Sequence, residues 1–454
     1  MSAETPSVPL PNQLTATDLL AMLADDKLSA SDVVEACLER IRLRDGDVQA
    51  WLAVNPQALA EAARLDALPR EKRGRLHGLP IAVKDVFDTH DLPTTYNSPL
   101  YGGFQPAADA AAVDLLRAEG AIVLGKTDTT EFAAAGQDAK TGNPYDLART
   151  SGGSSAGSAA AVADFHVPLA LATQTGGSTI RPASFCGVYA FKPSYGRVSR
   201  EGVRLYSISF DTVGWYGRSV ADLALLANVF GLDEPLGPES RPDALRMAVT
   251  TGPYHDRLQD KSLRAMTSAA DSLRQAGHQV HELELPPAFE ALDRYHRVIL
   301  HREGQAAFRN LARRHGAALH DDFHHRVENR DGTTLAELRD AYDGMGLARI
   351  AFDEIAANYD VVIAPSAAGF APVGRKPGDP VFNASWTLLG VPCVNIPVPP
   401  PASPGGLSLP IGVTVIAPRF ADSHLLAHAD RIAAVLSPKA PVVETVHEFR
   451  GSRP

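Results

Sequence analysis

Short apolar runs alternate with amphipathic helical stretches along most of the chain. GLPIAVKD (78–85) and AIVLGKT (121–127) have the length and β-branched character of buried strands, whereas the segment 109–120 between them has the apolar spacing of a helix. The same order returns with a small-residue helix at SSAGSAAAVADF (154–165) and a strand at VPLALAT (167–173). Strands connected by helices pack into a layered α/β structure. We therefore predict one large mixed β-sheet with helices on both faces.

The rest of the sequence extends this alternation without an internal repeat. Ser/Thr caps precede helical spacing at TATDLLAML and SASDVVEACLERIRLRD, and the last predicted helix is HLLAHADRIAAVL. A chain of 454 residues with 45% hydrophobic composition can bury one large core. We predict a single domain over residues 14–447, with flexible tails at 1–13 and 448–454 and loops at 233–243 and 400–406.

Composition excludes several classes of protein. The formal net charge is −10, from 43 Lys and Arg against 53 Asp and Glu, and no basic cluster forms a nucleic-acid footprint. The N-terminus lacks the pattern of a signal peptide, so we expect no export. Asp164 and His166 interrupt the most apolar stretch, so we expect no membrane-spanning helix. Cys37, Cys186 and Cys393 form no CxxC pair, which suits a reducing compartment. We expect a cytoplasmic protein with no metal, cofactor, nucleic-acid or membrane partner.

Three sequence features suggest chemistry that their context does not favour. GAIVLGKT (120–127) matches GxxxxGK[ST], but its filling residues are themselves apolar, which predicts a strand ending at Gly125 rather than a phosphate loop. GSSAG (153–157) matches GxSxG, but the polar, turn-like YDLARTS precedes it where a nucleophile elbow needs a buried strand. The histidine-rich stretch 313–326 contains no HExxH and is typical of a solvated surface.

Lys84, Ser154 and Ser178 form a constellation that can carry chemistry. The two serines lie 24 residues apart (178 − 154), a length over which a helix, a strand and a turn can return the chain beside its starting point. TGGSTIRP (175–182) follows an apolar strand, and its two glycines allow backbone amides to form an oxyanion hole beside Ser178. No histidine is marked by its context as a base, so the lysine is the candidate.

A lysine acts as a base only when it is neutral. Its pKa must then fall from about 10.4 toward about 7 to 8, which burial among the apolar neighbours of Lys84 can supply. Asp85 would oppose that fall, but neighbouring side chains on a strand point to opposite faces. The residues alone leave a second interpretation open, in which Lys84 is a surface lysine and both serines only cap helices and turns.

An extended resemblance favours the catalytic interpretation. The chain resembles the amidase signature family in the order and spacing of its segments, over about residues 78–230 and again near the C-terminus, in GLPIAVKD, GKTDTTEFA, GNPYDLARTSGGSSAGSAAAVA, LALATQTGGSTIRPASFCGVYAFKPSYGRVSREG, FDTVG, DVVIAPSAAGFAPVG, FNASWTLLGVPCVNIP and LPIGVTVIAP. The resemblance implies the amidase signature fold and a Ser-cisSer-Lys triad. Ser178 would be the nucleophile, Ser154 the relay serine on a cis peptide after Gly153, and Lys84 the base. The amides of Thr175, Gly176, Gly177 and Ser178 would form the oxyanion hole.

The position of Arg181 suggests a branch of that family. Arginine stands three residues after Ser178, as in the malonamidase-like branch, whereas many members place it two residues after. The resemblance to that branch implies that Arg181 binds a substrate carboxylate, which suits a planar bidentate donor; a structural ion pair is the alternative. Gln174 replaces an aspartate common in the family, which removes an acid that could neutralise Arg181. Further pocket residues implied by the resemblance are Gly153, Tyr206, Asn383 and Trp386; for each of the last three, a place in the core or in a loop is the favoured alternative.

The resemblance implies an amidohydrolase that cleaves a C–N bond of a small substrate through an acyl-enzyme on Ser178. Three alternatives to amide hydrolysis remain open. The substrate carbonyl can belong to a carbamate or carbamoyl-urea, or to an ester. The chain can also be one component of an amidotransferase, releasing ammonia from an amide donor. The family further suggests a homodimer.

Overall fold

The computed structural model describes residues 9–234, 244–399 and 408–437. Within these ranges one mixed sheet has eleven strands in the order β1-β3-β2-β6-β8-β7-β12-β13-β11-β9-β10. Their bounds are β1 Trp51–Val54, β2 Pro80–Lys84, β3 Ile122–Thr127, β6 Leu169–Gln174, β7 Tyr189–Lys192, β8 Thr212–Gly217, β9 Arg246–Val249, β10 Gln279–Glu282, β11 Val361–Pro365, β12 Cys393–Val398 and β13 Ile411–Ile416. A separate hairpin joins β4 Gly142–Asn143 and β5 Asp146–Thr150.

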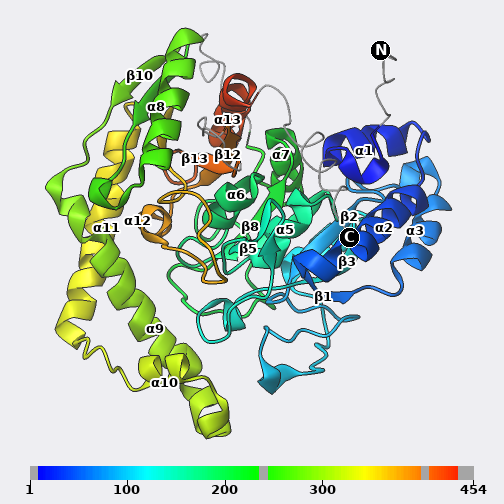
Figure 1. Ribbon diagram of the computed structural model, residues 1–454, viewed down its shortest axis with the longest axis horizontal. Helices are drawn as coiled ribbons and strands as arrows, with labels where there is room; N and C mark the ends of the chain where they lie inside the picture. The colour runs from blue at the N-terminus through cyan, green and yellow to red at the C-terminus, as the bar shows by residue number, and fades with distance from the viewer. Residues whose placement is uncertain (1–8, 235–243, 400–407, 438–454) are drawn as a thin grey trace, which may run out of the picture.

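The helices lie against this sheet and at its two ends (Figure 1). Their bounds are α1 Ala16–Ala24, α2 Ala30–Val48, α3 Ala58–Asp66, α4 Ala111–Ala118, α5 Ala156–Ala163, α6 Ile180–Cys186, α7 Val220–Val229, α8 Asp260–Gln275, α9 Leu292–His315, α10 Asp321–Val327, α11 Leu335–Ala356, α12 Val381–Leu389 and α13 Asp422–Leu436. The long helices α9 and α11 lie side by side at the end of the molecule opposite α1–α3 (Figure 1). No helix in the described ranges is long and apolar enough to cross a membrane.

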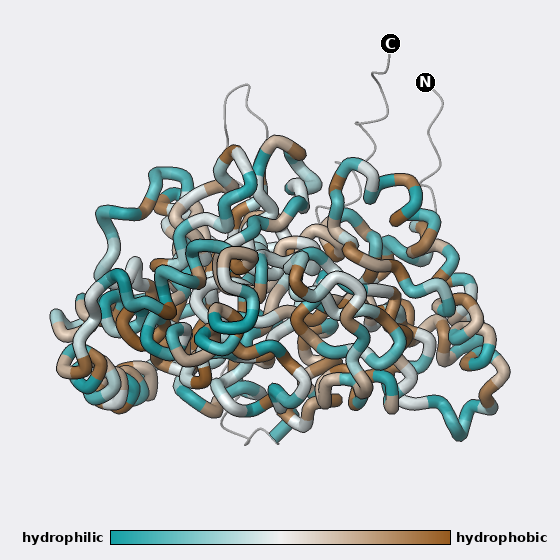
Figure 2. The backbone as a smooth tube through the Cα atoms, turned by 90° about the horizontal axis from the view of Figure 1, so that it is seen from below, coloured by the Kyte–Doolittle hydropathy of each residue, from teal (hydrophilic) through white to brown (hydrophobic). Residues whose placement is uncertain are grey.

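The predicted mixed sheet with helices on both faces is confirmed. Strand β2 runs parallel to β3 and β6, whereas β6 and β8 are antiparallel. Ile81 and Val83 of β2 join a hydrophobic core shared with α1, α4, α7, α8 and α13. Ala82 and its β6 partner Ala170 join a second core, shared with α2, α3, α5, α6, α11 and α12. Side chains that alternate along the strands thus fill a core on each face of the sheet. Along the outlying helices, hydrophilic and hydrophobic residues alternate, as helices with one buried side require (Figure 2).

The N-terminal caps form as the sequence predicts. Thr15 accepts a hydrogen bond from the amide of Asp18 before α1, and Ser29 forms a capping box with Asp32 before α2. The packed structure also includes residues before the predicted domain start at residue 14. Asn12 is buried, and its Nδ2 donates to Phe165 O at 3.0 Å. Residues 1–8, the predicted tail 448–454, and most of the predicted loops at 233–243 and 400–406 lie outside the described residues.

Two local predictions were wrong, and one helix was missed. Strand β3 does not end at Gly125 but continues to Thr127; a Cβ at Gly125 would lie 2.2 Å from Ala53 O, so this glycine permits the close approach of β1. The segment YDLARTS is not a turn, because residues 146–150 form strand β5. Helix α12 was not predicted, because all of its residues are buried and it therefore lacks the solvent-exposed face that marks an amphipathic helix.

Candidate active site

Lys84 ends β2 and is fully buried. Its Nζ lies 2.7 Å from Ser154 Oγ and 2.8 Å from Thr173 Oγ1, and no carboxylate of the described residues forms an ion pair with it. Burial holds the pKa of Lys84 well below its usual range, while the negative charge of Asp211 opposes part of that shift. Lys84 thus has the surroundings of a neutral amine beside a hydroxyl group.

Helix α5 brings its N-terminus to Lys84 by packing closely on the sheet. All eight of its residues are buried, and most are alanine, glycine or serine. A Cβ on Gly157 would lie 2.2 Å from Ala50 O and 2.5 Å from Asp128 N, so only glycine permits this approach. The small-residue composition of SSAGSAAAVADF is therefore a packing requirement that places the residues just before α5 at the ends of β2 and β6.

The two serine-bearing segments lie side by side. The peptide bond between Gly153 and Ser154 is cis, as the resemblance implies. The amide of Ser155 donates to Ser178 O at 3.3 Å, so the segment before α5 contacts the segment before α6 directly. Ser154 is 4% exposed and Ser178 is 8% exposed. The structure therefore brings Lys84, Ser154 and the Ser178 segment together at the ends of two neighbouring parallel strands.

Residues 175–178 connect β6 to α6 and present free amide groups. Within the described chain, the amides of Gly176, Gly177 and Ser178 donate to no other residue. By contrast, Gln174 Oε1 accepts from the next two amides, those of Thr179 and Ile180, at 2.9 and 3.0 Å. Unpaired amides beside a serine are the groups that stabilise an oxyanion in acyl transfer.

Arg181 is buried in the first turn of α6. Its NH2 donates to Gly153 O at 2.7 Å, whereas its Nε and NH1 are buried without a hydrogen-bond partner among the described residues. Burial lowers the pKa of Arg181 to about 10, and the charge of Asp379 opposes that shift. The structural ion pair considered as an alternative is not found among the described residues. A buried guanidinium with two unused donor nitrogens is suited to a ligand that supplies oxygen acceptors.

Tyr206 is buried, and its position gives no direct sign of a substrate contact. Its hydroxyl oxygen accepts a hydrogen bond from Arg326 Nε at 2.7 Å, and its ring lies 5.3 Å from that of Phe308. The assignment of Tyr206 to substrate binding therefore stays a prediction. Trp386 packs against Phe352 with ring centroids 5.3 Å apart, which places it in the core.

Asn383 lies against the loop formed by residues 175–178. A Cβ on Gly177 would lie 3.2 Å from the Asn383 side chain and 3.4 Å from Arg181 NH1. Asn383 Nδ2 donates to Ser366 O at 2.9 Å, which leaves Oδ1 buried and without a partner among the described residues. The side chains of Arg181 and Asn383, which carry these unused polar atoms, thus flank the same glycine.

Sequence reasoning missed three residues around Lys84 and Thr175. Thr173 contacts Lys84, as described above. Asp211 accepts from Thr175 Oγ1 at 2.6 Å, and burial raises the pKa of Asp211 to about 6. His296 Nε2 lies 2.9 Å from Thr175 O. The segment FDTVG contained Asp211, but His296 lies 121 positions from its partner, and no local pattern distinguished it from the other histidines.

Lys126, in the sequence that matches a phosphate loop, uses its amino group for contacts within the fold. It is fully buried, and its Nζ lies 2.9 Å from Asp85 Oδ1 and donates to Phe87 O at 2.9 Å. The same ion pair occupies Asp85, which therefore does not pair with Lys84. Strand β5, before the GSSAG match, is partly exposed and belongs to the small hairpin rather than to the main sheet. Neither motif has the context that its chemistry requires.

One cluster outside this site has the spacing of cation ligands. His90, Asp91 and Asp109 could together hold a metal ion, but Arg117 NH2 lies 2.7 Å from Asp91 and Arg117 Nε 3.1 Å from Asp109. The guanidinium group of Arg117 thus already supplies a positive charge to both carboxylates.

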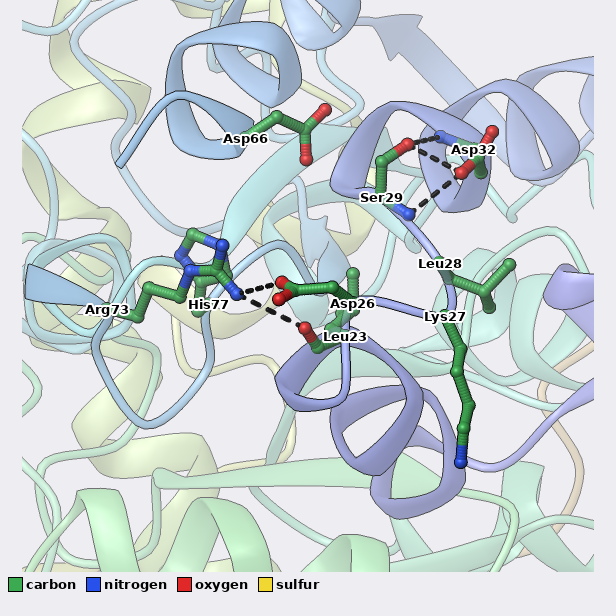
Figure 3. A pocket seen from close by; sticks show the side chains of 9 residues that line it. All are labelled: Leu23, Asp26, Lys27, Leu28, Ser29, Asp32, Asp66, Arg73 and His77. Atoms are coloured by element: carbon green, nitrogen blue, oxygen red, sulfur yellow. Dashed lines mark hydrogen bonds and ion pairs between the residues drawn. The ribbon is translucent and has the colours of Figure 1, made fainter. Parts of the chain in front are cut away.

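A polar cavity of about 240 Å³ lies among α1, α2 and residues 66–77 (Figure 3). None of the predicted site residues lines it. The pair formed by Asp26 with Arg73 and the capping box of Ser29 with Asp32 use most of its polar groups to hold the α1–α2 connection (Figure 3). We assign no chemistry to this cavity.

The chain is similar to known proteins in both sequence and fold. The family model described as Amidase matches residues 32–426. The chain is 32% identical to a subunit of glutamyl-tRNA(Gln) amidotransferase from Chloroflexus aggregans, over 92% of this chain and 95% of that protein. A crystal structure of an amidase superposes with a TM-score of 0.83 at 28% identity and covers 93% of this chain and 100% of its own. Peptide amidase from Stenotrophomonas maltophilia superposes with a TM-score of 0.75 at 27% identity, over 98% of this chain and 99% of that one.

Proposed function

Since this chain belongs to the amidase family, an enzyme family that acts on carbon–nitrogen bonds, we propose that it hydrolyses a small amide through an acyl-enzyme on Ser178. Lys84 Nζ accepts a proton from Ser154 Oγ while Ser154 Oγ accepts the proton of Ser178 Oγ. The Ser178 oxygen attacks the amide carbonyl carbon, and the amides at 175–178 bind the oxyanion. The C–N bond breaks as the relay returns the proton to the leaving nitrogen. Water then hydrolyses the ester by the same relay.

One observation carries this proposal. Lys84 is buried, has no carboxylate partner among the described residues, and lies 2.7 Å from Ser154 Oγ. A lysine held in this way is neutral at a pH at which an exposed lysine is charged, and can therefore act as a base.

Alanine at position 178 tests the nucleophile. We expect Ser178→Ala to lose hydrolysis of simple primary amides, measured as ammonia release, while its circular dichroism and melting temperature match those of the wild type. Ser151→Ala is a matched control, because Ser151 is a buried serine of the same region whose hydroxyl, among the described residues, makes only a long contact of 3.5 Å with Thr141 O. Full turnover by Ser178→Ala would refute the assignment.

The finer substrate class is also a proposal. The unused Nε and NH1 of Arg181 support an amide that carries a carboxylate, and the unused Oδ1 of Asn383 supports an N–H or O–H group beside it. Binding of a substrate carboxylate by Arg181 is the property that the resemblance to a malonamidase-like branch implied. A panel that sets amides against carbamates, carbamoyl-ureas and esters of the same acid would separate the remaining classes of carbonyl.

A second candidate function is the release of ammonia within an amidotransferase. The relative from Chloroflexus aggregans is named as a subunit of such an enzyme, and the match covers 92% of this chain. Co-purification of a partner in fixed stoichiometry would favour this function, whereas high activity of the isolated chain on simple amides would oppose it. The three buried free cysteines are compatible with our proposal of a cytoplasmic enzyme. That the chain forms a homodimer stays a prediction.

A further inference from the structure

We propose that His296 and Thr387 position the oxyanion hole by holding the carbonyl groups of Thr175 and Gly176, in the loop of residues 175–178. This inference rests on the proposed function, since it assigns a task to residues outside the predicted triad. Both side chains come from helices far along the chain, His296 from α9 and Thr387 from α12. Neither touches the proposed nucleophile, so both are positioning residues rather than catalytic residues.

His296 holds the first carbonyl group. Its Nε2 lies 2.9 Å from Thr175 O, and because a carbonyl oxygen carries no proton, Nε2–H must be the donor. The ring is stacked on Phe210 with centroids 4.6 Å apart and is 3% exposed. In a trans peptide the C=O and the following N–H point in opposite directions. The contact that draws Thr175 O toward α9 therefore turns the amide of Gly176 the other way.

Thr387 holds the second carbonyl group by the same principle. Its hydroxyl donates to Gly176 O at 2.6 Å, which fixes the direction of the Gly177 amide. The hydroxyl also lies 3.1 Å from Asn383 O, so its single proton has two possible acceptors, of which Gly176 O is the nearer.

Gln174 makes the Thr387 hydroxyl available as a donor. Its Oε1 accepts from the amides of Thr179 and Ile180, so its Nε2 must be the donating end, and Nε2 donates to Thr387 Oγ1 at 2.9 Å. A hydroxyl that accepts from Gln174 directs its own proton elsewhere. An aspartate or glutamate carboxylate at position 174 could not donate and would compete for that proton.

The loop needs such external holds because it contains two adjacent glycines. Glycine has no Cβ to restrict its backbone, so the peptides at Gly176 and Gly177 can turn over at little steric cost. A turned peptide would aim a carbonyl oxygen, instead of an N–H group, at the developing oxyanion. Asp211 adds a third hold by accepting from Thr175 Oγ1 at 2.6 Å.

Matched substitutions at position 387 test the inference. Thr387→Val keeps the shape and removes the donor, whereas Thr387→Ser keeps the donor. With a simple primary amide as probe, we expect Thr387→Val to lower kcat on the order of tenfold to a hundredfold with little change in KM, and Thr387→Ser to recover most of that loss. An aldehyde analogue of the substrate, which forms a tetrahedral adduct, should lose affinity for Thr387→Val in parallel with kcat.

Two other variants keep the test decisive if Thr387→Val fails to fold. His296→Gln preserves an N–H donor and should retain more kcat than His296→Leu. Gln174→Glu keeps the acceptor for the α6 amides but removes the donor to Thr387, and should behave like Thr387→Val.

An unchanged kcat in folded Thr387→Val, or an equal loss in Thr387→Val and Thr387→Ser, overturns the inference while Ser178-dependent hydrolysis stands. A wild type without Ser178-dependent hydrolysis overturns the proposed function and this inference together.

Discussion

Three buried lysines show how one type of residue can be given different tasks. Lys84, Lys126 and Lys192 are all fully buried. Lys126 is compensated by the carboxylate of Asp85, and Lys192 donates to Val391 O at 2.6 Å and to Pro193 O at 3.0 Å. Among the described residues, Lys84 contacts two hydroxyl groups, which stabilise a positive charge less than a carboxylate does. The proposed base is distinguished by hydroxyl neighbours, where Lys126 has a carboxylate and Lys192 has backbone carbonyl groups.

Arg181 supports a prediction at the same scale. Arg181→Ala should lower kcat/KM by about thirtyfold, or about 2 kcal/mol or more, for amides that carry a nearby carboxylate, because a charge-assisted contact is lost. Amides of equal size without a carboxylate should be hydrolysed at nearly the wild-type rate. Steady-state kinetics on such pairs of substrates checks this. An equal loss for both members of each pair would show that Arg181 supports the fold instead, through its bond to Gly153 O.

At the scale of elements, α5 is the part whose packing determines the site. Its N-terminus holds Ser154 beside Lys84 only because Gly157 lets the helix approach the backbone at Ala50 and Asp128. These neighbours are backbone atoms, which cannot move aside as a flexible side chain can. A single methyl group on α5 therefore acts on stability and on the site together.

Two glycine substitutions with opposite expected effects test this packing. Gly157→Ala should destabilise the fold by about 1–3 kcal/mol or more through overpacking and should also lower activity. Gly46 lies at an exposed position of α2, where an added Cβ would meet no atom within 4 Å outside its own turn of helix, so Gly46→Ala should stabilise the fold by about 0.5–1 kcal/mol without changing activity. Urea unfolding of both variants measures the effects. A neutral Gly157→Ala would show that α5 can shift away from the sheet without cost.

Local sequence signals predicted some elements and missed others. Elements with a clear local period, such as α2 and β2, were predicted correctly, because caps and apolar spacing are local signals. Helix α12 was missed because it is buried on all sides. Among the residues near the site, Lys84 and Ser154 lie in segments with their own patterns. His296 and Thr387 do not, since their contacts with the loop span 121 and 211 positions. Only the packed structure brings such residues together.

At the scale of the whole molecule, the sheet consists of two halves that follow the order of the sequence. Strands from residues 51–217 form the continuous half β1-β3-β2-β6-β8-β7, and strands from residues 246–416 form the half β12-β13-β11-β9-β10. The halves meet where β7 and β12 pair antiparallel, with Phe191 opposite Val394. The proposed triad lies entirely in the first half, whereas Asn383 and both carbonyl-holding residues come from the second part of the chain.

Burial of Lys84 in its neutral form should lower the free energy of unfolding of the whole molecule at neutral pH. The pKa of Lys84 is lowered on folding from an ordinary value of 10.5. Between the lowered folded pKa and about 10.5, the unfolded chain holds the proton that the folded chain has released, so this residue's contribution to stability rises with pH. We expect Lys84→Met to be more stable than the wild type at neutral pH, with a difference that shrinks as pH approaches 10.5. Denaturant unfolding of both proteins across this range measures it, and a pH-independent difference would contradict the prediction.

The seam between β7 and β12 has a consequence for the order in which the protein matures. A ribosome synthesises the chain from its N-terminus, so Lys84, Ser154 and Ser178 all emerge while β7 still lacks β12, one of its two neighbours, and before α9 and α12 exist. A nascent chain therefore exposes an unpaired strand edge, which invites incorrect association until residues 393–398 arrive. It also carries the serine without the groups that hold its loop. On this view the enzyme cannot act on amides of the cell until nearly its whole length has been translated.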